Sequence, residues 1–268
     1  MKKIFQISSL TLVFLFSMFI HAHPTEATSK KTKTYVLVHS AWLGAWQWHQ
    51  VAKTLETAGH TVITFDLAGH GSDRTPANDI TMETYVNQLL AILDGQQEKV
   101  VLVGPSFNGI TESRVAELRP KKIDRLVYLT AFLLLNGASF YDAVKGVPGS
   151  KAEHFFLSED QTEAFVNAEE MQNAFAHDIP AEAFNQAIAY IVPEPAAPLG
   201  YKLEVTDAVF GKIPKYYIEC TDDRTIPISA QRSIYEGKVE KVFTLNSSHT
   251  PNFSQPDKLA AILLEIIQ

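Results

Sequence analysis

The stretch Lys99-Val-Val-Leu-Val-Gly-Pro-Ser-Phe-Asn-Gly109 decides the fold of this chain of 268 residues. Its first part, Val100–Val103, is a short β-branched run typical of a strand buried on both faces. From Ile110 to Leu118 the apolar residues recur at helical spacing, and Arg119-Pro120 ends the helix. A strand that turns directly into a helix, with a serine at the turn, is the arrangement of a nucleophile elbow. Ser106 is therefore the candidate nucleophile, beside a helix N-terminus that favours negative charge.

The elbow departs from the usual Gly-x-Ser-x-Gly pattern. Gly104 precedes Ser106 by two residues, but Asn108 follows it by two and Gly109 comes one step late. Glycine is usual because strand and helix nearly touch there. Since asparagine is among the smaller replacements, we expect a slightly opened turn, with Pro105 tolerated at the strand end. A serine in an ordinary strand–helix turn is the alternative, because so short a pattern recurs by chance.

Length and composition favour one globular domain with an insertion. Hydrophobic residues make up 46% of the chain and charged residues 20%. The formal charge of −7 indicates no nucleic acid or anionic membrane as a partner. The single cysteine, Cys220, ends an apolar run and is expected to be a buried strand residue. The sequence shows neither a metal-ligand cluster nor a phosphate-binding glycine motif, so we expect no metal and no cofactor.

The N-terminus has the features of a secretory signal peptide. Lys2 and Lys3 form a positive region, Leu10–Ile20 is apolar, and Ala22 suits signal-peptidase cleavage. An uncleaved membrane anchor is the alternative, but the apolar core is short and diluted by polar residues. We expect a secreted or periplasmic protein, without stable membrane insertion after cleavage, that consists of a signal peptide, a polar linker and one domain at 1–22, 23–33 and 34–268.

Apolar runs alternate with helical patterns along most of the chain. Strands are expected at 34–39, 60–67, 100–103, 123–129, 214–220 and 239–245, and helices at 47–58, 82–94, 110–118 and 255–267. This alternation predicts an α/β fold with a doubly wound, mostly parallel sheet. Between about Leu135 and Asp207 the alternation stops, and short helical patterns lie at 163–176 and 181–190. Because this segment is too long for a loop, we expect a small inserted helical cap at about 135–207.

A serine nucleophile needs a base to take its proton and an acid to hold that base. In this fold the order along the chain is serine, acid, histidine. Of the nine histidines, His249 alone follows the strand at 214–220, just past the last strand. Asp222 and Asp223 both follow the strand that ends at Cys220, and composition does not choose between them. A surface histidine and an aspartate that caps its turn are the alternatives.

Two backbone amides are expected to stabilise a developing oxyanion. One belongs to Phe107, at the helix N-terminus, and the other is expected at Ala41, in the loop after His39. An apolar acyl or alcohol pocket would be lined by aromatic residues of the cap region, for which ordinary packing is the alternative: Phe132, Phe155 and Phe156.

Taken together, four segments resemble α/β-hydrolases, and more narrowly the branch of plant methylesterases, hydroxynitrile lyases and related bacterial esterases. They are Val36-Leu-Val-His-Ser-Ala-Trp-Leu-Gly-Ala-Trp-Gln-Trp48, Asp66-Leu-Ala-Gly-His-Gly-Ser72, Val103-Gly-Pro-Ser-Phe-Asn-Gly109 and Tyr217-Ile-Glu-Cys-Thr-Asp-Asp-Arg-Thr-Ile-Pro227. The resemblance covers nearly all of the chain from Thr34 onward. It implies the α/β-hydrolase fold and cofactor-free ester hydrolysis under a small helical cap.

The resemblance also implies roles for single residues. By the family pattern, the aspartate directly before the basic residue of Thr-Asp-Asp-Arg is the triad acid, which selects Asp223. The other matched positions are the nucleophile, the base, the two backbone donors and the hydroxyl beside them: Ser106, His249, Ala41, Phe107 and Ser40. Lyases of this branch carry a lysine directly after the catalytic histidine, whereas this chain has Thr250, which disfavours a hydroxynitrile lyase. Family members usually have His and Gly where this chain has Pro105 and Asn108.

These features predict a serine hydrolase that cleaves small to medium carboxylic esters, as small-molecule substrates, through an acyl-enzyme on Ser106. A ligand-binding homologue with weak catalysis is the first alternative, motivated by the departures at the elbow. A cofactor-free lyase acting at the same site is the second.

Overall fold

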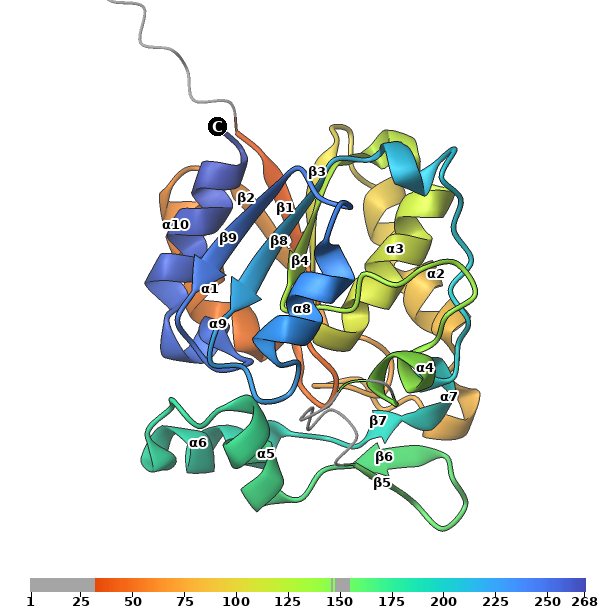
Figure 1. Ribbon diagram of the computed structural model, residues 1–268, viewed down its shortest axis with the longest axis vertical. Helices are drawn as coiled ribbons and strands as arrows, with labels where there is room; N and C mark the ends of the chain where they lie inside the picture. The colour runs from red at the N-terminus through yellow and green to blue at the C-terminus, as the bar shows by residue number, and fades with distance from the viewer. Residues whose placement is uncertain (1–31, 146, 148–154) are drawn as a thin grey trace, which may run out of the picture. The chain divides into compact units, whose positions relative to one another are not determined.

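Six of the apolar runs pair into one parallel sheet in the computed structural model, which describes residues 32–145, 147 and 155–268 (Figure 1). The strand order is β2-β1-β3-β4-β8-β9, and every pairing in this sheet is parallel. The strands are β1 (Thr34–Leu37), β2 (Thr61–Thr64), β3 (Val100–Pro105), β4 (Ile123–Leu129), β8 (Lys215–Cys220) and β9 (Lys241–Leu245). The predicted α/β fold with a mostly parallel sheet is confirmed, and β3 is buried along its whole length, as its β-branched run indicates.

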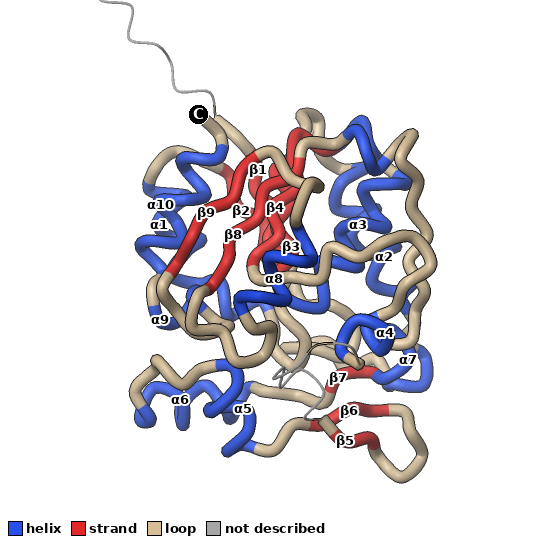
Figure 2. The backbone as a smooth tube through the Cα atoms, in the orientation of Figure 1, coloured by secondary structure: helices blue, strands red, loops and turns tan. Residues whose placement is uncertain are grey.

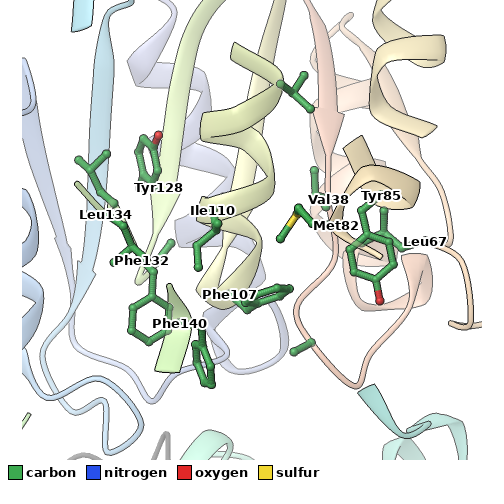
Figure 3. Packing of buried hydrophobic residues seen from close by; sticks show 14 of the residues in the cluster. Val38, Leu67, Met82, Tyr85, Phe107, Ile110, Tyr128, Phe132, Leu134 and Phe140 are labelled. Atoms are coloured by element: carbon green, nitrogen blue, oxygen red, sulfur yellow. The ribbon is translucent and has the colours of Figure 1, made fainter. Parts of the chain in front are cut away.

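Helices cover both faces of the sheet, so that the domain has three layers (Figure 2). One face carries α1 (His49–Thr57) and α10 (Pro256–Ile266), and the other carries α2 (Met82–Asp94), α3 (Gly109–Leu118) and α8 (Ile228–Tyr235). Alternate residues of a strand point to opposite layers, as the period of two requires. Val101 and Val103 thus pack in one core cluster and Val100 and Leu102 in the other. Figure 3 shows side chains from α2, α3 and β4 in the second of these clusters.

Short elements connect these layers. Single turns of 3-10 helix lie at Ala45–Trp48, Ala77–Asp79, Ser106–Asn108, Pro120–Lys122, Ile188–Tyr190 and Phe210–Lys212. The four-residue helix α9 (Pro251–Ser254) directly follows the loop that carries His249. Among the described residues, no helix has the length and apolar character that a transmembrane span requires. The expected signal peptide at 1–22 lies outside the described residues, as does the expected linker up to residue 31.

The insertion between β4 and β8 contains a small antiparallel sheet beside its helices. Its elements are α4 (Phe140–Val144), β5 (Phe156–Leu157), β6 (Glu163–Phe165), α5 (Ala168–Phe175), α6 (Ala181–Ala187), β7 (Glu194–Pro195) and α7 (Ala196–Leu199). The prediction of a helix over 163–176 is wrong for its first residues, because Glu163–Phe165 pairs with both β5 and β7. The Asn167 side chain caps α5 by accepting from the Glu170 amide, which starts this helix at Ala168.

Candidate active site

The turn after β3 presents Ser106 in a strained backbone conformation. Its φ is 52°, in the left-handed region that non-glycine residues rarely adopt. Close packing beneath the turn requires two glycines. A Cβ atom added to Gly104 would lie 2.5 Å from Glu112 Cδ, and one added to Gly109 would lie 2.9 Å from the Phe132 carbonyl oxygen. Strand and helix therefore approach each other most closely at Gly104 and Gly109. Position 108 does not need glycine and can hold the asparagine side chain.

Ser106, His249 and Asp223 form one hydrogen-bonded chain. His249 Nε2 lies 2.8 Å from Ser106 Oγ, and His249 Nδ1 lies 2.7 Å from Asp223 Oδ2. All three residues are buried, between 3% and 5% exposed. Because the carboxylate only accepts, Nδ1 carries the proton and Nε2 is left to accept one from the serine. This is the geometry of an activated nucleophile.

The two neighbouring aspartates lie in different environments. Asp223 Oδ1 accepts from the amides of Thr225 and Ile226 at 2.7 and 2.9 Å, and Thr130 Oγ1 donates to Oδ2. These donors fix the carboxylate that faces His249. The Asp222 side chain is 60% exposed, and its carboxylate contacts His177 of the cap at 3.0 Å. The geometry thus places Asp223, rather than Asp222, in the hydrogen-bonded chain.

The loop after β1 holds Ala41 between two fixed peptide groups. His39 Nε2 accepts from the Leu67 amide at 2.9 Å, so His39 Nδ1 carries the proton and donates to Ser40 O at 2.9 Å. Burial, and to a smaller extent the nearby His70, lowers the pKa of His39 to about 3, so the ring stays neutral. The carbonyl of Ser40 and the N–H of Ala41 belong to the same trans peptide and point to opposite sides. The hydrogen bond from His39 to Ser40 O therefore sets the direction of the Ala41 N–H.

Asn108, the departure from the glycine pattern, connects the elbow to this loop. Its Nδ2 donates to His39 O at 2.6 Å, and its Oδ1 accepts from Thr111 Oγ1 at 2.7 Å. The residue is buried. A glycine at this position would leave the His39 carbonyl without this donor, so the asparagine contributes a link that the usual motif lacks. Phe107 is buried beside it at the start of the helical turn, where its amide was predicted as the second oxyanion donor.

A cavity of about 240 Å³ lies between these loops and the cap. Its polar wall contains Ser40, Gln47, Ser106, His249, Thr250 and Asn252, and its apolar wall contains Leu43, Met171, Phe175, Ile179, Phe184 and Ile191. The described residues that line it include no Asp, Glu, Lys or Arg. Within the described part of the chain, no group of three or more His, Cys, Asp and Glu side chains is placed to hold a metal ion. The described walls of the cavity thus consist mainly of apolar and neutral polar side chains.

The structure places the three predicted pocket phenylalanines outside this cavity. Phe132 is buried in the core, with its ring centroid 5.2 Å from that of Phe140 (Figure 3). Phe155 packs against the same Phe140, and Phe156 is 56% exposed and stacks on Phe165 across two strands. Packing in the core occupies the Phe132 ring and packing within the cap occupies the other two, so the prediction that these rings line the pocket is corrected. Ser40, in contrast, does line the cavity.

The cap residues that line the cavity lie on α5, on α6 and on the turn between them, except for Ile191, which follows the 3-10 turn after α6. Sequence reasoning did not single them out, although Met171 and Phe175 stand four residues apart on one helical face. The same segment also binds the loop that carries His249. Thr250 Oγ1 donates to Phe175 O at 2.8 Å, and the Ser248 amide donates to Asp178 Oδ2 at 2.9 Å. Thr250, which stands where lyases have lysine, thus binds the cap backbone.

Comparison with known proteins identifies the family. The alpha/beta hydrolase family model matches residues 35–262. The Arabidopsis thaliana protein "Putative methylesterase 14, chloroplastic" is 31% identical over 91% of this chain and 75% of its own length, and Methylesterase 9 of that plant is 32% identical over 87% and 98%. Among solved structures, a pyrethroid hydrolase from Sphingobium faniae JZ-2 is 27% identical with a TM-score of 0.79, covering 88% of this chain and 97% of its own. The chain therefore belongs to the α/β-hydrolase family, in the methylesterase branch of carboxylic ester hydrolases.

Proposed function

We propose that the protein is a serine esterase that hydrolyses neutral carboxylic esters of small to medium size through an acyl-enzyme on Ser106. One observation carries this proposal: the hydrogen-bonded chain from Asp223 through His249 to Ser106 opens into a cavity whose described lining residues include no Asp, Glu, Lys or Arg. The chain supplies the nucleophile and base of acyl transfer. The cavity supplies a site for the uncharged parts of the substrate.

The reaction follows from the positions of the protons. His249 Nε2 takes the hydroxyl proton as Ser106 Oγ attacks the ester carbonyl carbon, and Asp223 stabilises the imidazolium that forms. The amides of Ala41 and Phe107 would stabilise the oxyanion. When the intermediate collapses, the C–O bond to the alcohol breaks and the alcohol takes the proton from His249. Water then attacks the acyl-enzyme with His249 as base, which releases the acid and restores the serine.

The cavity walls select among esters. Among the described lining residues, a charged substrate group would find no acidic or strongly basic side chain as a counter-ion, and burial of an unpaired charge is costly. The apolar wall of the cap favours an alkyl or aromatic group on the acyl or alcohol side. The names of the methylesterase and pyrethroid hydrolase relatives are consistent with uncharged ester substrates. We therefore place neutral esters with one apolar group first in a substrate panel.

The test is the intact mass of the protein after incubation with a small fluorophosphonate, beside Ser106→Ala. We expect one adduct on the wild type, none on the variant, and hydrolysis of neutral p-nitrophenyl esters by the wild type alone. A folded wild type without an adduct would contradict the proposal and favour a ligand-binding role. Hydrolysis that persists in Ser106→Ala would place the chemistry elsewhere.

Export is part of the proposal and has its own test. The positive, apolar and small-residue segments within residues 1–22 support it. We expect the mature protein, recovered from the periplasm or medium of an expressing bacterium, to begin at His23. Recovery of a chain that retains residues 1–22 from the cytoplasm alone would contradict it.

A further inference from the structure

Glu194 is a buried carboxylate that the cap inserts next to the loop carrying Ala41. It lies on β7 and is 1% exposed. Its Oε2 accepts from the Trp42 amide at 3.0 Å and lies 2.8 Å from His70 Nε2, and its Oε1 accepts from Tyr85 Oη at 3.0 Å. A carboxylate buried this deeply needs such donors to offset its lost hydration. The mechanism derived above assigns it no task.

The residue that Glu194 binds has an unusual backbone. Trp42 has a φ of 63°, in the left-handed region that bulky residues avoid. The cap holds it at three points: its amide donates to Glu194, its indole Nε1 donates to Ala164 O at 2.9 Å, and its carbonyl accepts from the Val192 amide at 3.0 Å. Strain of this kind persists only where the surroundings over-determine it. The cap therefore sets the conformation of the residue directly after Ala41.

His70 links Glu194 to the peptide group that precedes Ala41. Burial disfavours its charged form, but the Glu194 carboxylate, with smaller contributions from the Ala68 carbonyl and Asp66, outweighs this and raises the pKa of His70 above its ordinary value. The rings of His70 and His39 pack with centroids 4.8 Å apart. His39 in turn donates to Ser40 O. Glu194 thus touches the Ala41–Trp42 peptide directly and supports the Ser40–Ala41 peptide through two histidines.

We propose that Glu194 is a positioning residue of the oxyanion hole, because it orients the two peptide groups that flank Ala41 from the cap. The inference rests on the proposed function, since it takes the Ala41 amide as an oxyanion donor. It makes the cap part of the catalytic apparatus and not only a cover for the substrate. Small displacements of such a donor are expected to slow catalysis more than they weaken substrate binding.

The test compares Glu194→Gln and Glu194→Ala with the matched control Glu219→Gln. Glutamine keeps an oxygen that accepts from the Trp42 amide but removes the charge beside His70, whereas alanine removes both. Glu219 is also buried and has three side-chain partners, but these lie on α8 and β9, away from the oxyanion loop: Arg232, Tyr235 and Thr244. Substitution of Glu219 therefore measures the loss of a buried glutamate without a change at Ala41.

We expect kcat per active site on p-nitrophenyl butyrate to fall ~10-fold in Glu194→Gln and ~100-fold in Glu194→Ala, with KM changed less than about threefold. Active sites are counted by complete fluorophosphonate labelling, which removes unfolded protein from the comparison. A trifluoromethyl ketone forms an adduct on Ser106 that places an oxyanion in the hole. Its inhibition constant should rise by about the same factor as kcat/KM falls.

The control and the contrary outcomes separate this inference from the proposed function. Glu219→Gln should lower the Tm while kcat per active site and ketone affinity stay within about twofold of wild type. Glu194 variants with a lower Tm but unchanged kcat and ketone affinity would overturn the inference and leave Glu194 a stabilising residue only. A wild type that is neither labelled nor active would overturn the proposed function, and the positioning role with it. If alanine prevents folding, the nearly isosteric glutamine variant still decides the question.

Discussion

The sheet and the cap contribute to the site in different ways. The sheet side supplies the hydrogen-bonded chain of the candidate site, each member on a loop that follows a strand: Ser106 after β3, Asp223 after β8 and His249 after β9. The cap supplies apolar walls and hydrogen bonds to those loops, through Phe175 O and through Glu194. Under the proposed function, the reacting groups come from the sheet side, and the walls and supporting hydrogen bonds come from the cap. In the proposed reaction, the sheet places the reacting atoms, whereas the cap holds their loops and shapes the cavity.

The largest effect is expected on the sheet side, from Ser106→Ala. Removal of the nucleophile should lower kcat by a factor of about 10⁴ or more, because the remaining groups cannot replace covalent catalysis. The measurement is single-turnover hydrolysis of p-nitrophenyl butyrate beside wild type. Unchanged Tm would show that the loss is chemical. Activity of the variant near that of wild type would contradict the proposal that Ser106, on the sheet side, is the nucleophile.

Asp223→Asn should lower kcat by about 10⁴-fold, because asparagine favours the wrong tautomer of His249. Asp222→Asn is the matched control, since Asp222 is its neighbour in sequence but is largely exposed. We expect the control to stay within about threefold of wild type in kcat/KM. Equal losses in the two variants would contradict the assignment of the acid.

On the cap side, Phe184→Ala should change selectivity more than chemistry. Phe184 lines the cavity, and burial of such a ring contributes about 1.5–3 kcal/mol. We expect KM for a hexanoate ester to rise roughly tenfold, with little change for an acetate ester that does not reach the apolar wall. Phe156→Ala is the control, because Phe156 is exposed on the same cap. A loss of kcat on both esters in Phe184→Ala would contradict the prediction that this cap residue affects selectivity and not the chemical step.

The smallest effect concerns stability beneath the elbow. Glu112 is fully buried, and neither of its carboxylate oxygens has a hydrogen-bond partner among the described residues. Burial is the largest influence and raises the pKa of this carboxyl well above its ordinary value; the Gly104 amide lies close enough to lower it by less, without forming a well-aligned hydrogen bond to either oxygen. The folded state therefore binds the proton more tightly than the unfolded state. This contribution to stability is fully present below pH 4.5 and is lost as pH rises toward the folded-state pKa.

Glu112→Gln should remove this pH dependence. We expect its Tm to exceed that of wild type by about 2–4 °C at pH 8, the shift that corresponds to ~1 kcal/mol in a domain of this size. The difference should shrink as the pH falls toward 4.5. Thermal unfolding measured across this range checks the prediction. A Tm difference that stays constant with pH would show that the pKa of Glu112 is the same in the folded and unfolded states.

The sequence by itself determined the sheet side of this protein. Each strand of the sheet is a short apolar run, and each catalytic candidate stands directly after one, so that parallel topology brings Ser106, Asp223 and His249 to one edge. The bounds of β4 agree with the prediction to the residue. The choice of Asp223 over Asp222 needed the family resemblance, because both aspartates follow the same strand. Local sequence patterns were therefore enough to predict the position of a residue in the fold wherever that position is set by the strand that precedes it.

Tertiary packing decided the cap side. Phe156 and Phe184 are both phenylalanines of the insertion, but only the folded chain turns one to solvent and the other to the cavity. The contact of Glu194 with Trp42 spans 152 positions of sequence, and that of Asn108 with His39 spans 69. No short-range pattern encodes such pairs, because buried polar groups are matched by donors that arrive from distant segments. The periodicity of apolar residues predicts which face of a helix or strand is buried. Only the tertiary structure shows which residues that face contacts.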